Sequence, residues 1–273
     1  YTAAIKGMWV SNMRRPLWRR VRMSDTWATN LGVDYIVDGL VDSCIMEGGG
    51  RGRGAAVKNS GTGANIGIGV GRYRDEKLVV RNTVMRNSLN NNVYLERLEQ
   101  RGSNAQYPNC IILDGCTIDG SPIGISDCGS GGIVVKDTTI RYRNYGIAVR
   151  AGGGSSLAGR DGTLERVTFE DLANPVAAGD TRVAVMFATG PSGGGYRIID
   201  PLFVGVPANA IHVYSGADLR DGGLSLDLRR NQDVGNSILR VDRTTPGALS
   251  KLYVGGTVEG WAKVTGAPPI DVA

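Results

Sequence analysis

Val135-Lys136-Asp137-Thr138-Thr139-Ile140, followed shortly by Tyr145-Gly146-Ile147-Ala148-Val149, forms a two-part phrase that recurs along the chain. Five further segments share the form of its first part, with an apolar residue at each end and four variable residues between: Leu40–Ile45, Val79–Val84, Leu113–Ile118, Leu164–Phe169 and Ile198–Phe203. Segments like the second part follow at 92–95, 122–125, 174–177 and 209–213. Recurrence of this kind indicates a repeat protein.

The spacing of the repeats favours strands over helices. The shortest interval, from Ile118 to Ile140, is 22 residues, which is enough for three short strands and three turns. Apolar residues alternate with other residues, as at Ile147 and Val149, and this is the periodicity of a strand. A chain that lays down three strands per turn stacks each strand on its counterpart one coil earlier, about 4.8 Å away. We therefore predict an all-β, single-stranded parallel β-helix.

These repeats resemble those of the right-handed, pectate-lyase-like β-helix superfamily, which includes polysaccharide lyases, hydrolases, epimerases and phage tailspikes. The resemblance covers residues 33–260 and implies one domain over 1–273, a right-handed solenoid of about eight or nine coils. Residues 1–30 are expected to be an irregular first coil or the remnant of a larger chain. The superfamily's short catalytic motifs, such as Asn-Thr-Asp, Gly-His-Gly and Asp-Pro-His, do not occur here, so the reaction class stays open.

Composition narrows the choice of partners. The formal charge of +5 and the pI of about 9.1 favour an anionic partner such as an acidic polysaccharide. Nucleic acid is not expected, because no recognisable binding module accompanies the basic residues. No apolar run approaches the roughly 20 residues of a membrane span. The four cysteines lack metal-site spacing, and we expect them to be small buried residues, with one pairing among Cys110, Cys116 and Cys128 as the alternative. No metal or cofactor is predicted.

Strand phasing predicts which side chains point outward. One outward row is expected to contain Tyr94, Gly124, Ala148, Ala177 and His212. A second row is expected to contain Glu96, Ser126, Arg150 and Tyr214, with Asp127 and Asp180 beside it and Lys58 one rung further on. His212 should lie four rungs from Tyr94, about 19 Å away. Asp38 and Asp42, in the acidic series from Asp34 to Glu47, are expected in turns.

The predicted catalytic residues are Lys58, Tyr94, Glu96, Asp127 and Arg150. Hydrolysis of a glycosidic bond needs two carboxylates about 5–9.5 Å apart, which Glu96 and Asp127 could supply from adjacent coils. Elimination instead needs a base such as Lys, Arg or Tyr and a group that neutralises a uronate. The predicted substrate-binding residues are Ser126, Asp180, His212 and Tyr214.

Three classes of function follow from this reading. The first is an enzyme, a lyase, hydrolase or epimerase, that acts on an extended anionic polysaccharide along an outer groove. The second is a non-catalytic phage-tail or adhesin β-helix that binds surface glycan, and the third is a structural spacer. The resemblance to tailspikes also implies an extracellular or virion-associated protein and lateral association into a homotrimer.

Overall fold

The computed structural model describes most of the chain, with gaps between the described segments. These segments are residues 6–50, 63–97, 110–128, 132–150, 162–172, 182–188, 195–206, 209–214, 217, 223–230, 234–235, 237–242, 251–256 and 271–272. Within them the regular elements are strands, numbered β1 to β24, and every pairing between named strands is parallel. The predicted all-β class is confirmed.

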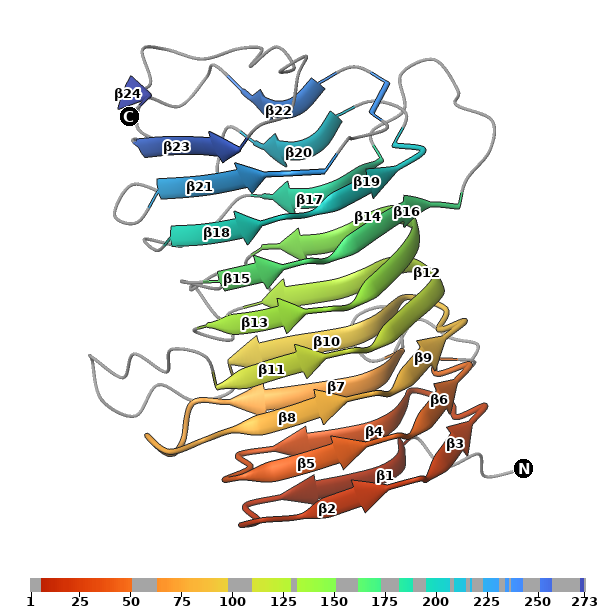
Figure 1. The fold of residues 1–273 in the computed structure, drawn as a ribbon. Coiled ribbons are helices and arrows are strands. Elements are labelled where there is room, and N and C mark those ends of the chain that lie inside the picture. The colour runs from red at the N-terminus through yellow and green to blue at the C-terminus, as the bar shows by residue number, and fades with distance from the viewer. Residues whose placement is uncertain are drawn as a thin grey trace.

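One sheet has ten strands and forms the surface called face 1. In the order of pairing, its strands are β2 (Leu17–Arg19), β5 (Gly39–Asp42), β8 (Leu78–Arg81), β11 (Ile111–Asp114), β13 (Ile133–Lys136), β15 (Gly162–Glu165), β18 (Gly195–Ile199), β21 (Gly223–Leu228), β23 (Lys251–Gly256) and β24 (Asp271–Val272). The strands lie one above another along the molecule (Figure 1).

The other sheet has 14 strands and turns a corner, so it supplies two faces. Face 2 contains β3 (Arg22–Ser24), β6 (Ile45–Glu47), β9 (Val84–Arg86), β16 (Thr168–Asp171), β19 (Leu202–Val204) and the first residues of β12 and β14. Face 3 contains β1 (Lys6–Ser11), β4 (Thr29–Asp34), β7 (Ala64–Val70), β10 (Asn91–Arg97), the ends of β12 (Thr117–Cys128) and β14 (Thr139–Val149), β17 (Val183–Phe187), β20 (Asn209–Val213) and β22 (Ser237–Val241).

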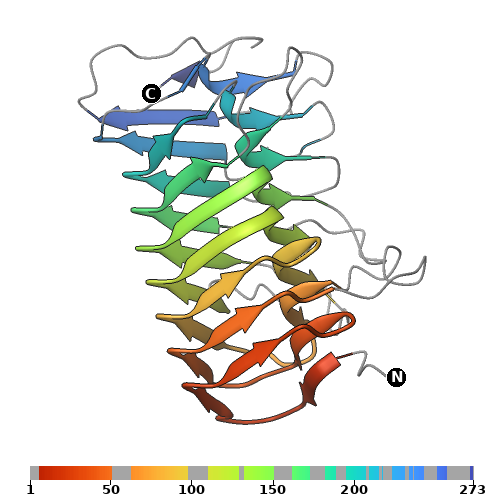
Figure 2. The ribbon, with the colours of Figure 1, turned by 90° about the vertical axis from the view of Figure 1, so that its right-hand side faces the viewer.

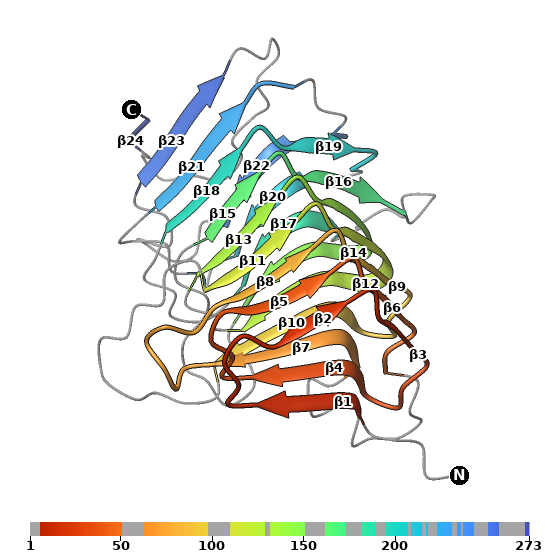
Figure 3. The ribbon, with the colours of Figure 1, turned by 60° about the horizontal axis from the view of Figure 1, so that its bottom comes forward.

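The chain visits the three faces in turn and then starts the next coil, as the views in Figures 2 and 3 show. This arrangement of parallel strands fits a β-helix or solenoid. The first coil, formed by β1, β2 and β3, pairs in register with the second coil, through contacts such as Leu31 with Met8 and Val41 with Trp18. Inward side chains from all three faces form a continuous apolar core.

Register corrects two of the six repeat segments. Leu113 pairs with Val135 on one side and with Val80 on the other, and Val80 pairs with Val41, so the inward positions are Val41 and Val80. The predicted ends Leu40 and Val79 each lie one residue earlier and are half-buried. In Leu40-Val41 and Val79-Val80, two apolar residues are adjacent, so either one fits the repeat pattern. Pairing with the neighbouring coils decides which of the two points inward.

Tight turns between faces 1 and 2 recur at one position of the repeat. Asn82 and Asp137 have φ values of 49° each there, and their backbone N–H groups donate to carbonyls of the following coil. Asparagine and aspartate tolerate this left-handed region better than most residues. At the corner between faces 2 and 3, the side chains of Asn30, Asn65 and Asn92 form a row. The amide nitrogen of Asn30 donates to Asn65 Oδ1 at 2.7 Å, and that of Asn65 donates to Asn92 Oδ1 at 2.6 Å. Each of the three amide nitrogens also donates to a backbone carbonyl. This row holds the starts of β4, β7 and β10 in register.

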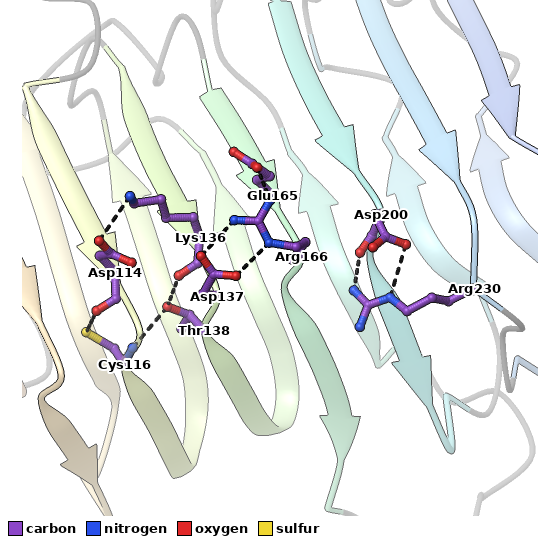
Figure 4. Close-up of polar contacts among 9 residues, drawn as sticks. All are labelled: Asp114, Cys116, Lys136, Asp137, Thr138, Glu165, Arg166, Asp200 and Arg230. Atoms are coloured by element: carbon purple, nitrogen blue, oxygen red, sulfur yellow. Dashed lines mark hydrogen bonds and ion pairs between the residues drawn. The ribbon is translucent and has the colours of Figure 1, made fainter.

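Charged residues alternate in sign from coil to coil along two lines. On face 1 the line is Arg19, Asp42, Arg81, Asp114, Lys136 and Glu165, and on face 2 it is Glu47, Arg86, Asp119, Arg141 and Glu170. Figure 4 shows the first line where Lys136 pairs with Asp114 at 3.0 Å. Because like charges directly opposite one another are destabilising in a sheet, a slip by one coil would place repelling groups together.

Asp42 should make folding sensitive to acid. Hydrogen bonds from Arg81, and then from Ser43 and Arg19, lower the pKa of Asp42 to about 2 from 3.8. A carboxylate with a lowered pKa stabilises the fold above its unfolded pKa, and this contribution is lost as the pH falls from about 4 to 2. Urea titrations at several pH values should show a shallower loss of stability across that window for Asp42→Asn than for the unmodified chain. An equal slope for both proteins would contradict the assignment.

Candidate functional site

Strand alternation on face 3 produces two rows of outward residues. The first outward row is Trp9, Gly32, Gly67, Tyr94, Ser126, Ala148, Met186, His212 and Arg240. The second outward row begins Ser11, Asp34, Gly69, Glu96 and Cys128. Both rows cross β1, β4, β7, β10 and β12, which are successive neighbours in the sheet (Figure 1).

The carboxyl group of Glu96, in the second outward row, has a shifted pKa. Burial raises its pKa above the ordinary value, and the nearby negative charge of Asp34 raises the pKa further, while Lys6 and a hydrogen bond from Tyr94 act in the opposite direction. Asp34 lies two strands away, on the far side of Gly69. Two strand spacings put the Cα atoms of Asp34 and Glu96 about 9.6 Å apart. Gly69, the residue between them, contributes no side chain of its own.

Two aromatic residues flank this carboxylate pair. Trp9 is 58% exposed, and its Nε1 donates to Asp34 Oδ2 at 2.6 Å. The indole lies over Gly32, since a Cβ atom there would be only 3.0 Å from Trp9 Cδ1. At Gly67 the nearest such neighbour is a methyl group of Thr29 at 3.4 Å. Gly67 is itself partly exposed, and it lies between Gly32, which the indole covers, and Tyr94.

Tyr94 and Arg150 complete the polar surroundings. Burial raises the pKa of the Tyr94 phenol, and the neighbouring Cys128 and Glu96 raise it further. Arg150 Nε donates to Ser126 Oγ at 3.1 Å, and the Arg150 charge has a small lowering effect on the pKa of Tyr94. Tyr94, Glu96, Ser126 and Arg150 thus lie together, as predicted. Their order differs: Ser126 lies beside Tyr94, where Gly124 was expected, and Cys128 lies beside Glu96.

The expected outward position of Asp127 is wrong. Asp127 pairs with Leu95 and Val149, both core residues, and its side chain is completely buried. Tyr196, 69 residues further along the chain on β18, donates its hydroxyl to Asp127 Oδ2 at 3.0 Å. A carboxyl group occupies a core position because a hydrogen-bond donor from face 1 reaches it. Asp127 therefore cannot form a carboxylate pair with Glu96 on the outer surface.

Removal of the Tyr196 hydroxyl should destabilise the fold without touching the outer surface. Leaving a buried hydrogen-bond acceptor without its donor costs about 1–3 kcal/mol, so Tyr196→Phe should lower the free energy of unfolding by about that amount. Guanidinium unfolding monitored by circular dichroism measures the change. Tyr145→Phe, a change on face 3, serves as a control for loss of a tyrosine hydroxyl. Unchanged stability in Tyr196→Phe would show that the Asp127 carboxyl does not depend on this bond.

Two of the remaining predicted residues, His212 and Tyr214, lie away from the Glu96 site. His212 lies four strands from Tyr94, as predicted. Its Nε2 lies 3.0 Å from Asp242 Oδ1, its ring stacks on Tyr214 at 3.8 Å, and burial lowers its pKa. Between Tyr94 and His212, the outer surface of face 3 carries an apolar cluster that contains Ile123, Ala148, Val183 and Met186. Lys58, Asp180 and the expected strand at 174–177 lie outside the described residues. The outward residue next to Ala148, which was predicted to be Ala177, is Met186 of β17.

Sequence reasoning did not assign Trp9 and Asp34 to the site. Asp34 was seen as part of an acidic series, and Trp9 lies in a stretch whose phase was not apparent. The alternation of Met8 and Val10 with Trp9 and Ser11 in β1 is the signal that could have found the indole.

The described cysteines Cys44, Cys110, Cys116 and Cys128 are buried free thiols, as the first of the two alternatives predicted. Across the described segments, no group of three or more His, Cys, Asp or Glu side chains is arranged to hold a metal ion. The same segments contain no helix with the length and apolarity to cross a membrane. Comparisons found no match to a protein-family model, to a curated protein or to a solved structure.

Proposed function

We propose that this protein is a right-handed, single-stranded β-helix of the pectate-lyase-like kind that binds an extended acidic polysaccharide across face 3 and hydrolyses it beside Gly67. The observation that carries the proposal is the pair of outward carboxyl groups, Asp34 and Glu96, on either side of Gly69. Glu96, with its raised pKa, is the general acid. Asp34 is the general base that activates water.

The spacing of the pair favours inversion at the anomeric carbon. Inverting glycosidases hold their two carboxyl groups about 6.5–9.5 Å apart, whereas retaining enzymes hold them at about 5–5.5 Å. Side chains that start about 9.6 Å apart at Cα and interact electrostatically fit the wider range. The hydrogen bond from Trp9 Nε1 holds the Asp34 carboxylate in one orientation.

Hydrolysis agrees with the surroundings better than elimination does. A base for elimination needs a depressed pKa, but the pKa of Tyr94 is raised. Arg150 donates to Ser126 and lies where its charge can neutralise an acidic sugar. The exposed face of Trp9 provides an apolar platform for a sugar ring, and Lys6, whose ammonium group is 5.4 Å from the indole centroid, adds a second cation.

The test is incubation of the full chain with a panel of acidic and neutral polysaccharides. We expect new reducing ends without unsaturated products, and proton NMR should show that the first product has the inverted anomeric configuration. Unsaturated products would show that the reaction is elimination and would contradict hydrolysis. Binding without any cleavage would favour the non-catalytic adhesin, and absence of both binding and cleavage would leave the structural spacer. The extracellular or virion-associated location and the homotrimer stay predictions.

A further inference from the structure

A pocket of about 210 Å³ lies at the corner where face 3 passes to face 1 in the first three coils. It is lined by Asn12, Met13, Arg14, Tyr35, Val37 and Tyr73. Asn12 and Tyr35 follow the ends of β1 and β4, and Tyr73 lies on the connection from β7 to β8 (Figure 3). Pockets for drug-sized ligands span about 300–1,000 Å³, so this pocket suits a single small ring.

The loop that carries Tyr73 is held in shape from inside. Glu76 is buried, and its carboxylate accepts hydrogen bonds from the backbone N–H groups of Gly71, Arg72 and Tyr73 at 2.7, 2.9 and 2.8 Å. Tyr73 then donates its hydroxyl to Asn12 Oδ1 at 3.0 Å. A pocket wall fixed before the ligand arrives loses less entropy on binding than a wall that must become ordered.

The pocket combines a cation, hydroxyl-binding groups and apolar walls. Arg14 pairs with Asp75 at 3.0 Å, but both side chains are more than half exposed. Exposed ion pairs contribute little, so Arg14 can turn to a ligand at small cost. Its planar guanidinium group matches a carboxylate with two parallel hydrogen bonds. The Tyr73 oxygen, which donates to Asn12, keeps lone pairs that accept from a hydroxyl group, and Tyr35 and Val37 supply apolar contact.

We propose that this pocket is a second binding site, which takes one hydroxylated ring carrying a carboxylate, that is, a sugar acid. Arg14 binds the carboxylate, Tyr73 accepts a hydrogen bond from a ring hydroxyl, and Tyr35, Met13 and Val37 enclose the apolar edge of the ring. The site lies at the corner of the coil and shares no lining residue with the carboxylate pair of Asp34 and Glu96. It does not depend on cleavage at Glu96.

The experiment is a titration of the full chain with sodium glucuronate, followed by heteronuclear NMR and calorimetry. Shifts should centre on residues 12–14, 35–37 and 73. Arg14→Gln should weaken binding about tenfold or more, because it removes a charge-assisted hydrogen bond. Arg22→Gln is the matched control, since Arg22 has similar exposure in the same coil and a single carboxylate partner, Glu47, at 3.5 Å. It should leave binding unchanged.

Two further ligands and two further variants make the outcome decisive. Glucose should bind much more weakly than glucuronate, and benzoate should also bind more weakly because it lacks hydroxyl groups. Tyr73→Ala should weaken binding with an unchanged melting temperature. Glu96→Gln should bind glucuronate normally, so failure of the hydrolysis proposal would leave this one standing. Equal affinity for glucose or benzoate, equal binding by Arg14→Gln, or shifts confined to other residues would overturn the proposal.

Discussion

The Ile147→Asp variant is expected to lose the folded state. Ile147 is completely buried and lies between Ile125 of β12 and Val185 of β17 in one inward row. A carboxylate there would lose its hydration without gaining a partner, and an uncompensated buried charge costs about 3–5 kcal/mol. That cost is a large part of the about 5–15 kcal/mol that stabilises a typical native protein.

Two control variants measure the effect of lost side-chain volume at this position and the effect of the same charge at an exposed position. Ile147→Val should cost about 0.5–1.5 kcal/mol, which reports the loss of one methylene group. Asn144→Asp introduces the same charge at an exposed position of β14 and should change stability by less than about 0.5 kcal/mol. Circular dichroism and urea unfolding measure all three variants. A cooperative transition for Ile147→Asp within about 1 kcal/mol of the unmodified chain would contradict the assignment of this row to the core.

Asp127 shows why the same change is tolerated elsewhere. It occupies the inward row next to that of Ile147, and Tyr196 donates a hydrogen bond to it. Ile147 has apolar neighbours on both adjacent strands. The contrast predicts that the effect of a buried carboxylate on this coil depends on whether face 1 supplies a donor opposite it.

Glu96→Gln should produce the largest loss of activity of any single change outside the core. The amide keeps the shape of the side chain but cannot donate a proton to the leaving oxygen, and positioned acids contribute about 10²–10⁴-fold to the rate. Hydrolysis on the best substrate of the panel should fall by about that factor, while the melting temperature is retained. Glu165→Gln, on face 1, is the matched control and should keep full activity.

The pH profile and direct titration test the same assignment independently. Because the pKa of Glu96 is raised, its acid form persists above the usual range for glutamate, and hydrolysis should decline as the pH rises through that pKa. Carbon-13 NMR of the Glu96 carboxyl should show a lower pKa in Asp34→Asn, since the Asp34 charge raises it, and a higher pKa in Lys6→Gln. An unshifted titration in Asp34→Asn, or full activity in Glu96→Gln, would remove the carboxylate pair from the mechanism.

Register explains which parts of the site were predictable. Tyr94, Glu96 and Arg150 could be placed outward because alternation within their own strands decides that point. The strand ending in Asp127 was misplaced by two residues, because Ile123 and Ile125 form a better apolar pair in the sequence than Ile125 and Asp127. The structure instead puts Ile123 on the outer surface of face 3, in an apolar cluster with Met186.

The sequence by itself determined the repeat, the use of strands and the outward direction of Glu96. These features depend on local backbone preference and on a period of two within one strand. Only the tertiary structure decided that Asp127 is buried, that Val41 and Val80 are the inward members of their doublets, and that Asp34 and Trp9 lie near Glu96. These pairings join residues about one or more coils apart, and loops of variable length between coils erase their spacing from the sequence.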